Sequence, residues 1–279
     1  MVDLRQTKEY ANYMQKIGWQ VEQVSNFQIF VKKIPLLGKV IKIQRAENIT
    51  KENIDKLLSS QKPTVLYFEP PLSPQFPQFT QFTLSRSCFL PPKTIHIDLQ
   101  KSTEQLSKEF KPKTRYNIGL AQRRGLTVIE SADINTFCCL WKSAARNRGM
   151  WLPLGKEIKS IFESFGKNAR ILFAYNNDIL LGGVLLILTK DAGYYMYACS
   201  THEGKKLFAP TLLAWEAIQL AKKEECNVFD FEGIYDERYP QTKSWKGFTK
   251  FKEGFGGEII IYPPTLMKNY NFLSKILNL

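Results

Sequence analysis

The chain is poor in the side chains that most often hold metal ions. It has only two histidines, His96 and His202, and its five cysteines show no C-x-x-C spacing. Such a set offers no credible zinc site, so we expect no metal. An odd number of cysteines without that spacing is typical of reduced thiols and therefore of a cytoplasmic protein.

Long apolar runs are also missing. No stretch approaches the roughly 18 uncharged apolar residues that are needed to span a bilayer. The first residues, Met-Val-Asp-Leu-Arg-Gln-Thr-Lys-Glu, lack the apolar core of a signal peptide. Both absences favour a protein of the cytoplasm.

Acidic residues are scarce relative to basic ones. Asp and Glu contribute 26 side chains against 39 from Lys and Arg, which gives a formal net charge of +13. Such an excess favours polyanionic partners, namely nucleic acid, nucleotide-linked substrates or an anionic membrane face. Apolar residues make up 44% of the 279, enough for one large or two medium domains and too many for a disordered chain.

The apolar pattern predicts helices and strands along the whole chain. Thr50 is expected to cap a helix whose Ile54, Leu57 and Leu58 face inward. Residues 169–175 and 179–188 predict an antiparallel hairpin. The remaining predicted elements are helices at 9–17, 102–110, 114–124, 133–148, 156–165, 210–223 and 265–279, and strands at 19–24, 27–32, 40–44, 64–68, 94–99, 127–130, 193–199 and 228–231.

An antiparallel hairpin, a helix and a parallel-type strand occur twice in this order, which predicts a duplicated α/β (α+β) domain. We expect a first domain over residues 1–104, completed by a C-terminal helix at 263–279, and a second over 105–262. Residues 70–92, rich in Pro, Gln, Phe and Ser, are expected to form a loop or weak strand that faces the substrate.

Two segments are rich in positive charge, and the first also contains aromatic residues and glycines. From Trp245 to Glu258 the chain alternates lysines, aromatic residues and glycines before an apolar strand at 259–262. Lysines neutralise phosphates and aromatic faces stack on bases, so this segment suits a nucleotide-bearing ligand, although a strand-edge loop with solvated lysines has the same pattern. The second segment is the predicted helix at 114–124 with the residues before it. We expect it to form a phosphate-binding surface or a solvated helix face, because it carries the basic side chains Lys108, Lys111, Lys113, Arg115, Arg123 and Arg124.

The predicted order of elements resembles the acetyltransferase (GNAT) fold, in tandem, with each mixed and mostly antiparallel sheet flanked by helices. That fold holds coenzyme A with a Gln/Arg-x-x-Gly-x-Gly/Ala turn before a helix. Here the turn from Thr201 to Pro210 has a single glycine, and Pro210 stands where a third small residue would be. The sequence departs from the coenzyme A pattern, and no cofactor is expected.

Three motifs give a closer resemblance, to the FemABX family of peptidoglycan aminoacyltransferases. They are Lys113-Thr114-Arg115-Tyr116-Asn117-Ile118 followed by Arg123-Arg124-Gly125, the strand 194–199 followed by Pro210-Thr211-Leu212-Leu213-Ala214-Trp215, and Gly247 to Glu258 with its Phe251-Lys252 and Gly254-Phe255-Gly256-Gly257. No long helical arm fits between the first and the last motif. The chain therefore resembles armless members of the family, which act on a nucleotide-linked muramoyl pentapeptide.

The resemblance implies an enzyme that moves an amino acid from aminoacyl-tRNA to an amine of the stem peptide of UDP-N-acetylmuramoyl-pentapeptide or lipid II. It implies a monomer, in peripheral contact with the inner membrane face where the acceptor is lipid-linked. Lys252 matches the family lysine that meets the tRNA end and stabilises developing charge. Phe251 would stack on the terminal adenine or belong to the core. Glu69 matches an acid-Pro pair considered as the base, with a structural role as the alternative.

Further residues are expected to bind the two substrates. Asp230 and Glu232 are expected to bind the acceptor, or else to have a structural role. Tyr195 and Tyr197 are expected on one strand face, where they would line the acceptor site or pack in the core. Lys156 follows Trp151-Leu152-Pro153, where the family has an arginine. The expected acceptor-binding residues are Lys16, Lys156, Tyr195, Tyr197, Asp230 and Glu232, and the expected tRNA-binding residues are Lys113, Arg115, Arg123, Arg124, Lys246 and Lys250.

Two other functions fit the same sequence. One is a coenzyme A-dependent N-acyltransferase on the same fold, which the nature of the donor would distinguish. The other is a basic RNA-binding module that kept the fold and lost turnover, which an inert Lys252 would favour.

Overall fold

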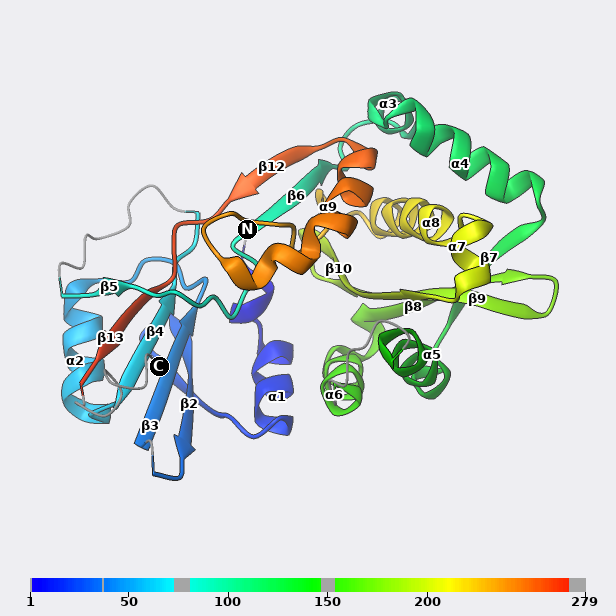
Figure 1. Cartoon of the computed structure of the whole chain (residues 1–279). Helices are drawn as coiled ribbons and strands as arrows, with labels where there is room; N and C mark the ends of the chain where they lie inside the picture. The colour runs from blue at the N-terminus through cyan, green and yellow to red at the C-terminus, as the bar shows by residue number, and fades with distance from the viewer. Residues whose placement is uncertain (1, 37, 73–80, 147–153, 271–279) are drawn as a thin grey trace. The chain divides into compact units, whose positions relative to one another are not determined.

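The computed structural model describes residues 2–36, 38–72, 81–146 and 154–270, which form two compact units (Figure 1). The first unit consists of Met1–Lys93, Tyr235–Ser244 and Ile261–Leu279, and the second of Thr94–Ile234 and Trp245–Ile260. Each unit has its own sheet.

The first unit is built mainly from the N-terminal third of the chain. Its elements are the 3-10 helix η1 (Leu4–Gln6), α1 (Lys8–Lys16), β1 (Gln20–Val24), β2 (Phe27–Ile34), β3 (Gly38–Gln44), α2 (Lys51–Gln61), β4 (Val65–Glu69), β5 (Thr83–Leu84), η3 (Pro240–Trp245) and β13 (Leu266–Asn269). The strand order is β1-β2-β3-β4-β13-β5, and among the described pairs only β3 and β4 run parallel.

Helix α2 makes the crossover between the two parallel strands. Thr50 caps it as predicted, in a reciprocal capping box with Asn53. Ile54 and Leu57 are fully buried against the sheet, whereas Leu58 is only partly buried. Residues 73–80, in the middle of the loop or weak strand expected over 70–92, lie outside the described part of the chain.

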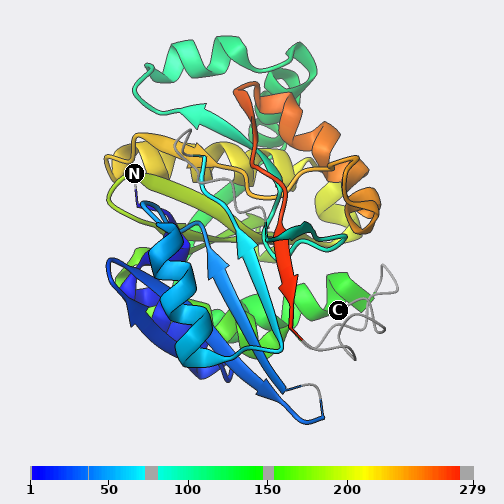
Figure 2. The ribbon, with the colours of Figure 1, turned by 90° about the vertical axis from the view of Figure 1, so that its left-hand side faces the viewer.

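The predicted C-terminal helix at 265–279 is wrong for its first residues. Leu266–Asn269 form strand β13, which lies between β4 and β5, and Figure 2 shows it in red beside β4. The apolar pattern of these residues fits a helix or a strand. Pairing with β4 and β5 satisfies the backbone hydrogen-bonding groups of Leu266–Asn269 and so selects the strand. The expected return to the first domain holds for these residues, and 271–279 lie outside the described residues.

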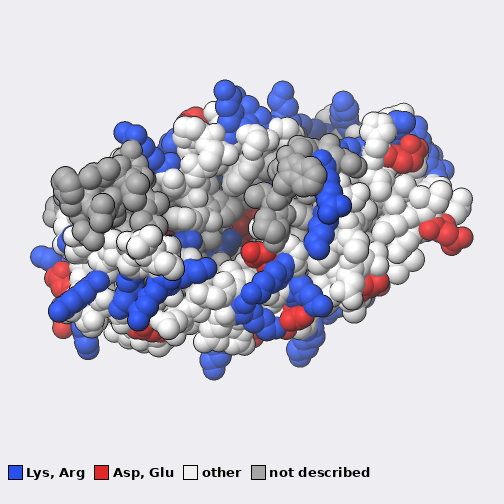
Figure 3. Space-filling view, turned by 60° about the horizontal axis from the view of Figure 1, so that its bottom comes forward, with Lys and Arg blue, Asp and Glu red and all other residues white. Residues whose placement is uncertain are grey.

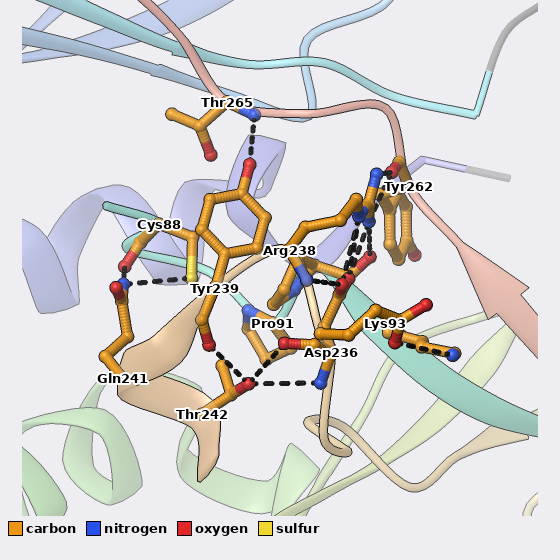
Figure 4. A network of polar contacts seen from close by, with 12 residues as sticks. Cys88, Pro91, Lys93, Asp236, Arg238, Tyr239, Gln241, Thr242, Tyr262 and Thr265 are labelled. Carbon is orange, nitrogen blue, oxygen red and sulfur yellow. Dashed lines mark hydrogen bonds and ion pairs between the residues drawn. The ribbon is translucent and has the colours of Figure 1, made fainter. Parts of the chain in front are cut away.

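A polar network attaches Tyr235–Ser244 to the first unit (Figure 4). The Asp236 carboxylate accepts hydrogen bonds from the Arg238 guanidinium, which also donates to the carbonyl oxygens of Tyr262 and Pro92. The Tyr239 hydroxyl accepts a hydrogen bond from the Thr265 amide at 2.8 Å. The network therefore fixes the chain that leads into β13.

The second unit contains the rest of the elements. They are β6 (Lys93–Asp98), α3 (Thr103–Glu109), α4 (Pro112–Arg123), β7 (Leu126–Ser131), α5 (Ile134–Arg146), α6 (Gly155–Phe165), η2 (Gly166–Asn168), β8 (Ala169–Asn176), β9 (Ile179–Leu188), β10 (Ala192–Ser200), α7 (His202–Lys206), α8 (Ala209–Lys223), β11 (Val228–Asp230), α9 (Lys246–Lys252), η4 (Glu253–Phe255) and β12 (Glu258–Ile261). The strand order is β12-β6-β11-β10-β9-β8-β7.

This unit repeats the plan of the first. Strands β9 and β10 form an antiparallel pair, α8 makes the crossover, and β11 returns parallel to β10. Helix α8 covers one face of the sheet, and α5 and α6 cover the other (Figure 1). The structure confirms the predicted α/β (α+β) class with two mixed, mostly antiparallel sheets flanked by helices.

The division into units differs from the expected domain boundary at residue 104. Strand β6 pairs antiparallel with β11, from Val228↔Asp98 to Asp230↔His96, so residues 94–104 lie in the second unit. The segment 235–244, expected in the second domain, lies in the first. Both differences come from pairing between residues far apart in the sequence, which a local pattern does not contain.

The segment Trp245–Phe255 is helical. The sequence alone allows a ligand-binding segment or a loop at the edge of a strand. Phe248, Phe251, Lys252 and Phe255 recur at helical spacing, a signal that was present in the sequence. Phe255 is 1% exposed and packs on Phe110 and Phe231, so it anchors the segment in the core.

We expect Tyr239→Phe to lower the free energy of unfolding by about 1–3 kcal/mol, because the buried Thr265 amide loses its acceptor. Urea denaturation of the two proteins measures the difference. Tyr116→Phe is the matched control, since Tyr116 is 60% exposed on α4, and it should leave stability unchanged. Equal stability of wild type and Tyr239→Phe would show that this hydrogen bond does not hold the C-terminal strand.

Candidate active site

Lys252 is a buried cation at the end of α9. Its side chain donates a hydrogen bond from Nζ to the Gly233 carbonyl oxygen at 2.6 Å and lies 5.0 Å from the centre of the Phe248 ring. The residue is 7% exposed. Burial lowers the pKa of Lys252 to about 8, although the nearby charges of Glu232 and Asp230 act to raise it. Near neutral pH this lysine can therefore exist in either protonation state.

The glycines after α9 let the chain approach the sheet closely. Gly257 has φ +84°, and a Cβ atom added there would lie 2.4 Å from the His96 carbonyl oxygen. Only glycine combines this backbone conformation with that contact. Phe255 is buried in the core and Gly257 lies against β6. Together they hold the chain that follows Lys252 and so fix the position of this lysine.

Asp230, the last residue of β11, is the centre of a second set of contacts. Its carboxylate accepts hydrogen bonds from the Thr94 hydroxyl and from the Glu232 amide, the latter at 2.7 Å. His96 Nε2 lies 3.2 Å from the other carboxylate oxygen. Burial acts to raise the pKa of Asp230, but the His96 contact and these hydrogen bonds outweigh it and hold the pKa below its usual value.

Glu232 lies in a strained part of the backbone between Asp230 and Gly233. It is 8% exposed and has φ +58°, the left-handed region that residues with a Cβ atom rarely adopt. A Cβ atom added at Gly233 would lie 2.6 Å from the Trp245 ring. The turn is thus held by Asp230 on one side and by Trp245 on the other, and its Gly233 carbonyl is aimed at Lys252. Strain of this kind is often found at functional sites.

The structure brings together four of the residues predicted to be functional. Lys252, Asp230 and Glu232 share one electrostatic environment, and Phe251, half-buried, packs on Phe255 at 5.4 Å between ring centres. Such a site offers a positioned cation and buried carboxylates, which suits a reaction that develops negative charge on an oxygen.

Sequence reasoning missed the contributions of Thr94 and His96 to this site. The signal was the alternation of Thr94 and His96 along β6, which points both side chains to one face of the sheet. What the sequence lacked was the pairing of His96 with Asp230 across β6 and β11, 134 residues apart.

The expectation that Tyr195 and Tyr197 share one face of β10 is wrong. A bulge shifts the register between them, so that Tyr195 pairs with Leu186 and Tyr197 with the adjacent Leu185. Tyr195 packs in the core beneath α8, against Phe229 and Phe231. Tyr197 instead contacts the ring of Trp141 on α5, at 6.4 Å between ring centres.

Glu69 lies in the first unit with both carboxylate oxygens engaged. One accepts hydrogen bonds from the amides of Phe89 and Leu90, at 2.8 and 2.6 Å, and the other from the Gln44 side chain at 2.8 Å. The residue is 2% exposed. Nearby, burial lowers the pKa of Lys42 to about 8, although the charge of Glu69 acts to raise it.

The predicted tRNA-binding residues divide into two groups. Lys113, Arg123, Lys246 and Lys250 are exposed. Arg115 donates hydrogen bonds to the carbonyls of Lys108 and Phe110 at the end of α3, and Arg124 donates to the Lys206 carbonyl at 3.1 Å. Arg115 and Arg124 therefore have structural contacts with backbone carbonyls.

The two lysines predicted to bind the acceptor lie in different units. Lys16 ends α1 in the first unit and Lys156 lies near the start of α6 in the second, and both are exposed. Trp151, Leu152 and Pro153 lie outside the described residues. On the face drawn in Figure 3, lysine and arginine side chains are more prominent than acidic ones.

The described residues contain neither a membrane-spanning helix nor a metal cluster. No helix there has both the length and the apolar character needed to cross a bilayer. No group of three or more His, Cys, Asp or Glu side chains in these ranges could hold a metal ion.

Comparisons with known proteins give a consistent fold. The FemX crystal structure matches with a TM-score of 0.81 and 16% identity, over 99% of this chain and 95% of that chain. L-PGS from Bacillus licheniformis matches with a TM-score of 0.62 and 11% identity, over 95% and 89%. A tandem GNAT protein from the clavulanic acid biosynthesis pathway matches with a TM-score of 0.52 and 12% identity, over 88% and 81%. These similarities establish a fold of two GNAT-like domains.

The sequence comparisons are more selective. No curated protein matches the chain significantly. The sequence model of the FemAB family matches residues 153–271, a range that includes β11, the Glu232 turn and α9 with Lys252. With this match and the FemX fold over nearly its whole length, the chain is similar to the FemAB family in sequence over residues 153–271 and to FemX in fold.

Proposed function

We propose that this protein is an aminoacyltransferase that moves an amino acid from aminoacyl-tRNA to an amine of the stem peptide of a peptidoglycan precursor, and so builds cross-bridges. The acceptor is UDP-N-acetylmuramoyl-pentapeptide or lipid II. The match of residues 153–271 to the FemAB family model and the similarity to FemX support the transferase class. We place the reaction in the cytoplasm and expect a monomer that touches the inner membrane face when the acceptor is lipid-linked.

The observation that carries the proposal is the buried Lys252 with its hydrogen bond to Gly233. In the proposed reaction the acceptor amine attacks the ester carbonyl of the donor, and a C–N bond forms while negative charge develops on the carbonyl oxygen. The charged Lys252 side chain stabilises that oxygen. The C–O bond to the tRNA ribose then breaks, and the proton lost by the amine passes to the ribose oxygen.

The carboxylates take separate roles in this proposal. Glu232 accepts a hydrogen bond from the neutral acceptor amine and orients it, and Asp230 fixes the turn that carries Glu232 and Gly233. Because the oxygens of Glu69 accept three hydrogen bonds, we propose that Glu69 holds the chain at Phe89 and Leu90 rather than acting as the base. Since the ribose oxygen takes the amine proton, no protein base is required.

The donor RNA is proposed to lie along the exposed cations of the second unit. Lys113 and Arg123 lie on α4, and Lys246 and Lys250 lie four residues apart on α9, so each pair can reach phosphates from its own helix. Phe251 and the partly exposed Phe248 lie on the same helix as Lys252 and are proposed to contact the terminal adenine. Lys16 and Lys156 are proposed as phosphate contacts of the acceptor.

Incubation with mixed aminoacyl-tRNAs and each purified precursor tests the function, with the mass of the stem peptide as the readout. We expect one aminoacyl residue to be added, and Lys252→Met to slow transfer by about 10²–10³-fold. The ratio of the wild-type rate to the Lys252→Met rate should shrink as the pH rises through about 8, where Lys252 loses its charge. Titration of the acceptor amine affects both proteins and cancels in this ratio.

Lys56→Met is the control for this experiment, because Lys56 is an exposed lysine on α2, and it should transfer at the wild-type rate. Modification of the amine by acetyl-coenzyme A instead of aminoacyl-tRNA would favour the N-acyltransferase. Binding of tRNA with no transfer to any precursor would favour the RNA-binding module.

Donor binding should depend steeply on salt. We expect Lys113→Gln and Arg123→Gln each to weaken tRNA binding and to reduce the slope of log K against log salt by about 1, since each removes one phosphate contact. Filter binding over a series of salt concentrations measures the slope. Lys56→Gln should keep the wild-type slope, and an unchanged slope in both α4 variants would exclude this helix from the RNA interface.

Glu232 provides a test that separates stability from function. Glu232→Gly should be about 1 kcal/mol more stable than Glu232→Ala, because glycine adopts φ +58° without strain. Both variants should raise the KM for the acceptor, since both lack the carboxylate. Thermal unfolding and acceptor titrations measure the two effects, and an unchanged KM in both variants would remove Glu232 from the acceptor site.

A further inference from the structure

His96 is joined to the Lys252 site but has no part in the reaction described above. It lies directly opposite Asp230 in the antiparallel pair of β6 and β11, with Nε2 3.2 Å from the Asp230 carboxylate. Its side chain is 14% exposed and lines an open pocket of about 610 Å³ on the second unit. His96 therefore connects the buried carboxylate with solvent.

We propose that His96 is a positioning residue that balances the charge of Asp230 and so leaves the Lys252 ammonium available to the reacting oxygen. The inference rests on the proposed function for its consequence in catalysis, whereas the coupling of His96 to Lys252 can be measured without any substrate.

A continuous set of contacts joins the two residues. Asp230 accepts hydrogen bonds from the Thr94 hydroxyl and the Glu232 amide in addition to its contact with His96. The Thr94 hydroxyl also lies 2.7 Å from the Glu232 carbonyl oxygen, so the strained turn is held at two points. The next residue, Gly233, supplies the carbonyl that accepts the hydrogen bond of Lys252. A change at Asp230 therefore reaches Lys252 both through the turn and through space.

The charges around His96 favour its protonated form. Burial lowers the pKa of His96, but the hydrogen bond with Asp230 and the charges of Asp230, Glu232 and Glu258 outweigh it, so the pKa lies above its usual value. These groups come from β11, the turn that follows it and β12. The charged residues lining the pocket with His96 are Asp98, Glu109, Lys101 and Glu258, and among them Lys101 and Glu109 form an ion pair at 2.7 Å.

The sign of the coupling follows from these charges. Asp230 and Glu232 both attract the Lys252 cation and act to raise its pKa. When His96 is charged, it offsets Asp230, and less of the Lys252 charge is neutralised by the carboxylates. When His96 is neutral or absent, Asp230 is unbalanced, Lys252 holds its proton to higher pH, and its charge is drawn toward the carboxylates instead of the substrate.

The experiment measures the pKa of Lys252 by competitive labelling of its amine across a range of pH, with the labelled peptide quantified by mass spectrometry. In His96→Gln we expect the pKa of Lys252 to rise by about half a unit or more, because one compensating charge is lost. His202→Gln is the matched control, since His202 is exposed on α7, and it should leave this pKa unchanged. The pH at which the wild-type advantage over Lys252→Met declines should shift upward by the same amount in the His96→Gln background.

A reciprocal measurement keeps His96 in place and so does not depend on the folding of His96→Gln. The chain has only two histidines, so the His96 imidazole signals are assigned by comparison with His202→Gln, and their titration is followed by NMR. Because coupling between two sites is mutual, Lys252→Met should raise the pKa of His96. Unchanged pKa values in both measurements overturn the proposal.

The outcomes also distinguish this inference from the proposed function. Coupled titration of His96 and Lys252 in a protein that transfers no amino acid supports the coupling and contradicts the aminoacyltransferase. Transfer to a precursor with a Lys252 pKa that is the same in wild type and His96→Gln supports the aminoacyltransferase and overturns the role of His96.

Discussion

The hydrogen bond from the Lys252 ammonium to the Gly233 carbonyl is the interaction on which the site depends. A buried cation is costly unless polar groups replace the water that it loses. The protein supplies one carbonyl at 2.6 Å, an aromatic ring and two carboxylates, which together compensate only in part, since the pKa of Lys252 still falls to about 8. The contacts of Lys252 thus offset only part of the free energy that its charge loses on burial. A further negative group would therefore interact favourably with this lysine.

The duplicated fold explains where the carboxylates come from. In each unit the strand that runs parallel to its neighbour ends in a buried acid, Glu69 in β4 and Asp230 in β11. Each acid accepts hydrogen bonds from backbone amides, those of Phe89 and Leu90 for Glu69 and that of Glu232 for Asp230. The repeated structural device is a carboxylate that holds a loop. Among the described residues, the loop held in the second unit carries a residue with positive φ, Glu232, and a carbonyl that accepts the hydrogen bond of a buried lysine.

Local signals in the sequence were sufficient for much of the fold. The capping box at Thr50, the hairpin of β8 and β9 and the order of elements all follow from patterns within short windows. The features that were missed depend on partners far along the chain. Leu266–Asn269 is a strand because β4 and β5 lie on either side of it, and His96 belongs to the site because β6 pairs with β11. The bulge between Tyr195 and Tyr197 has no signature in the residues themselves, so strict alternation placed both rings on one face.

The lysines of α9 show why a motif gives the chemistry of a site before its geometry. Lys246 and Lys250 are four residues apart and exposed, whereas Lys252, two residues further along the same helix, is buried. Because successive residues of a helix are about 100° apart, Lys252 points roughly away from Lys250. One short helix therefore presents cations to solvent on one face and a single cation to the interior on the other. In the proposed function the outer face binds the phosphates of the donor RNA and the inner face meets its ester carbonyl, a division that requires the lysines to differ in burial as they do.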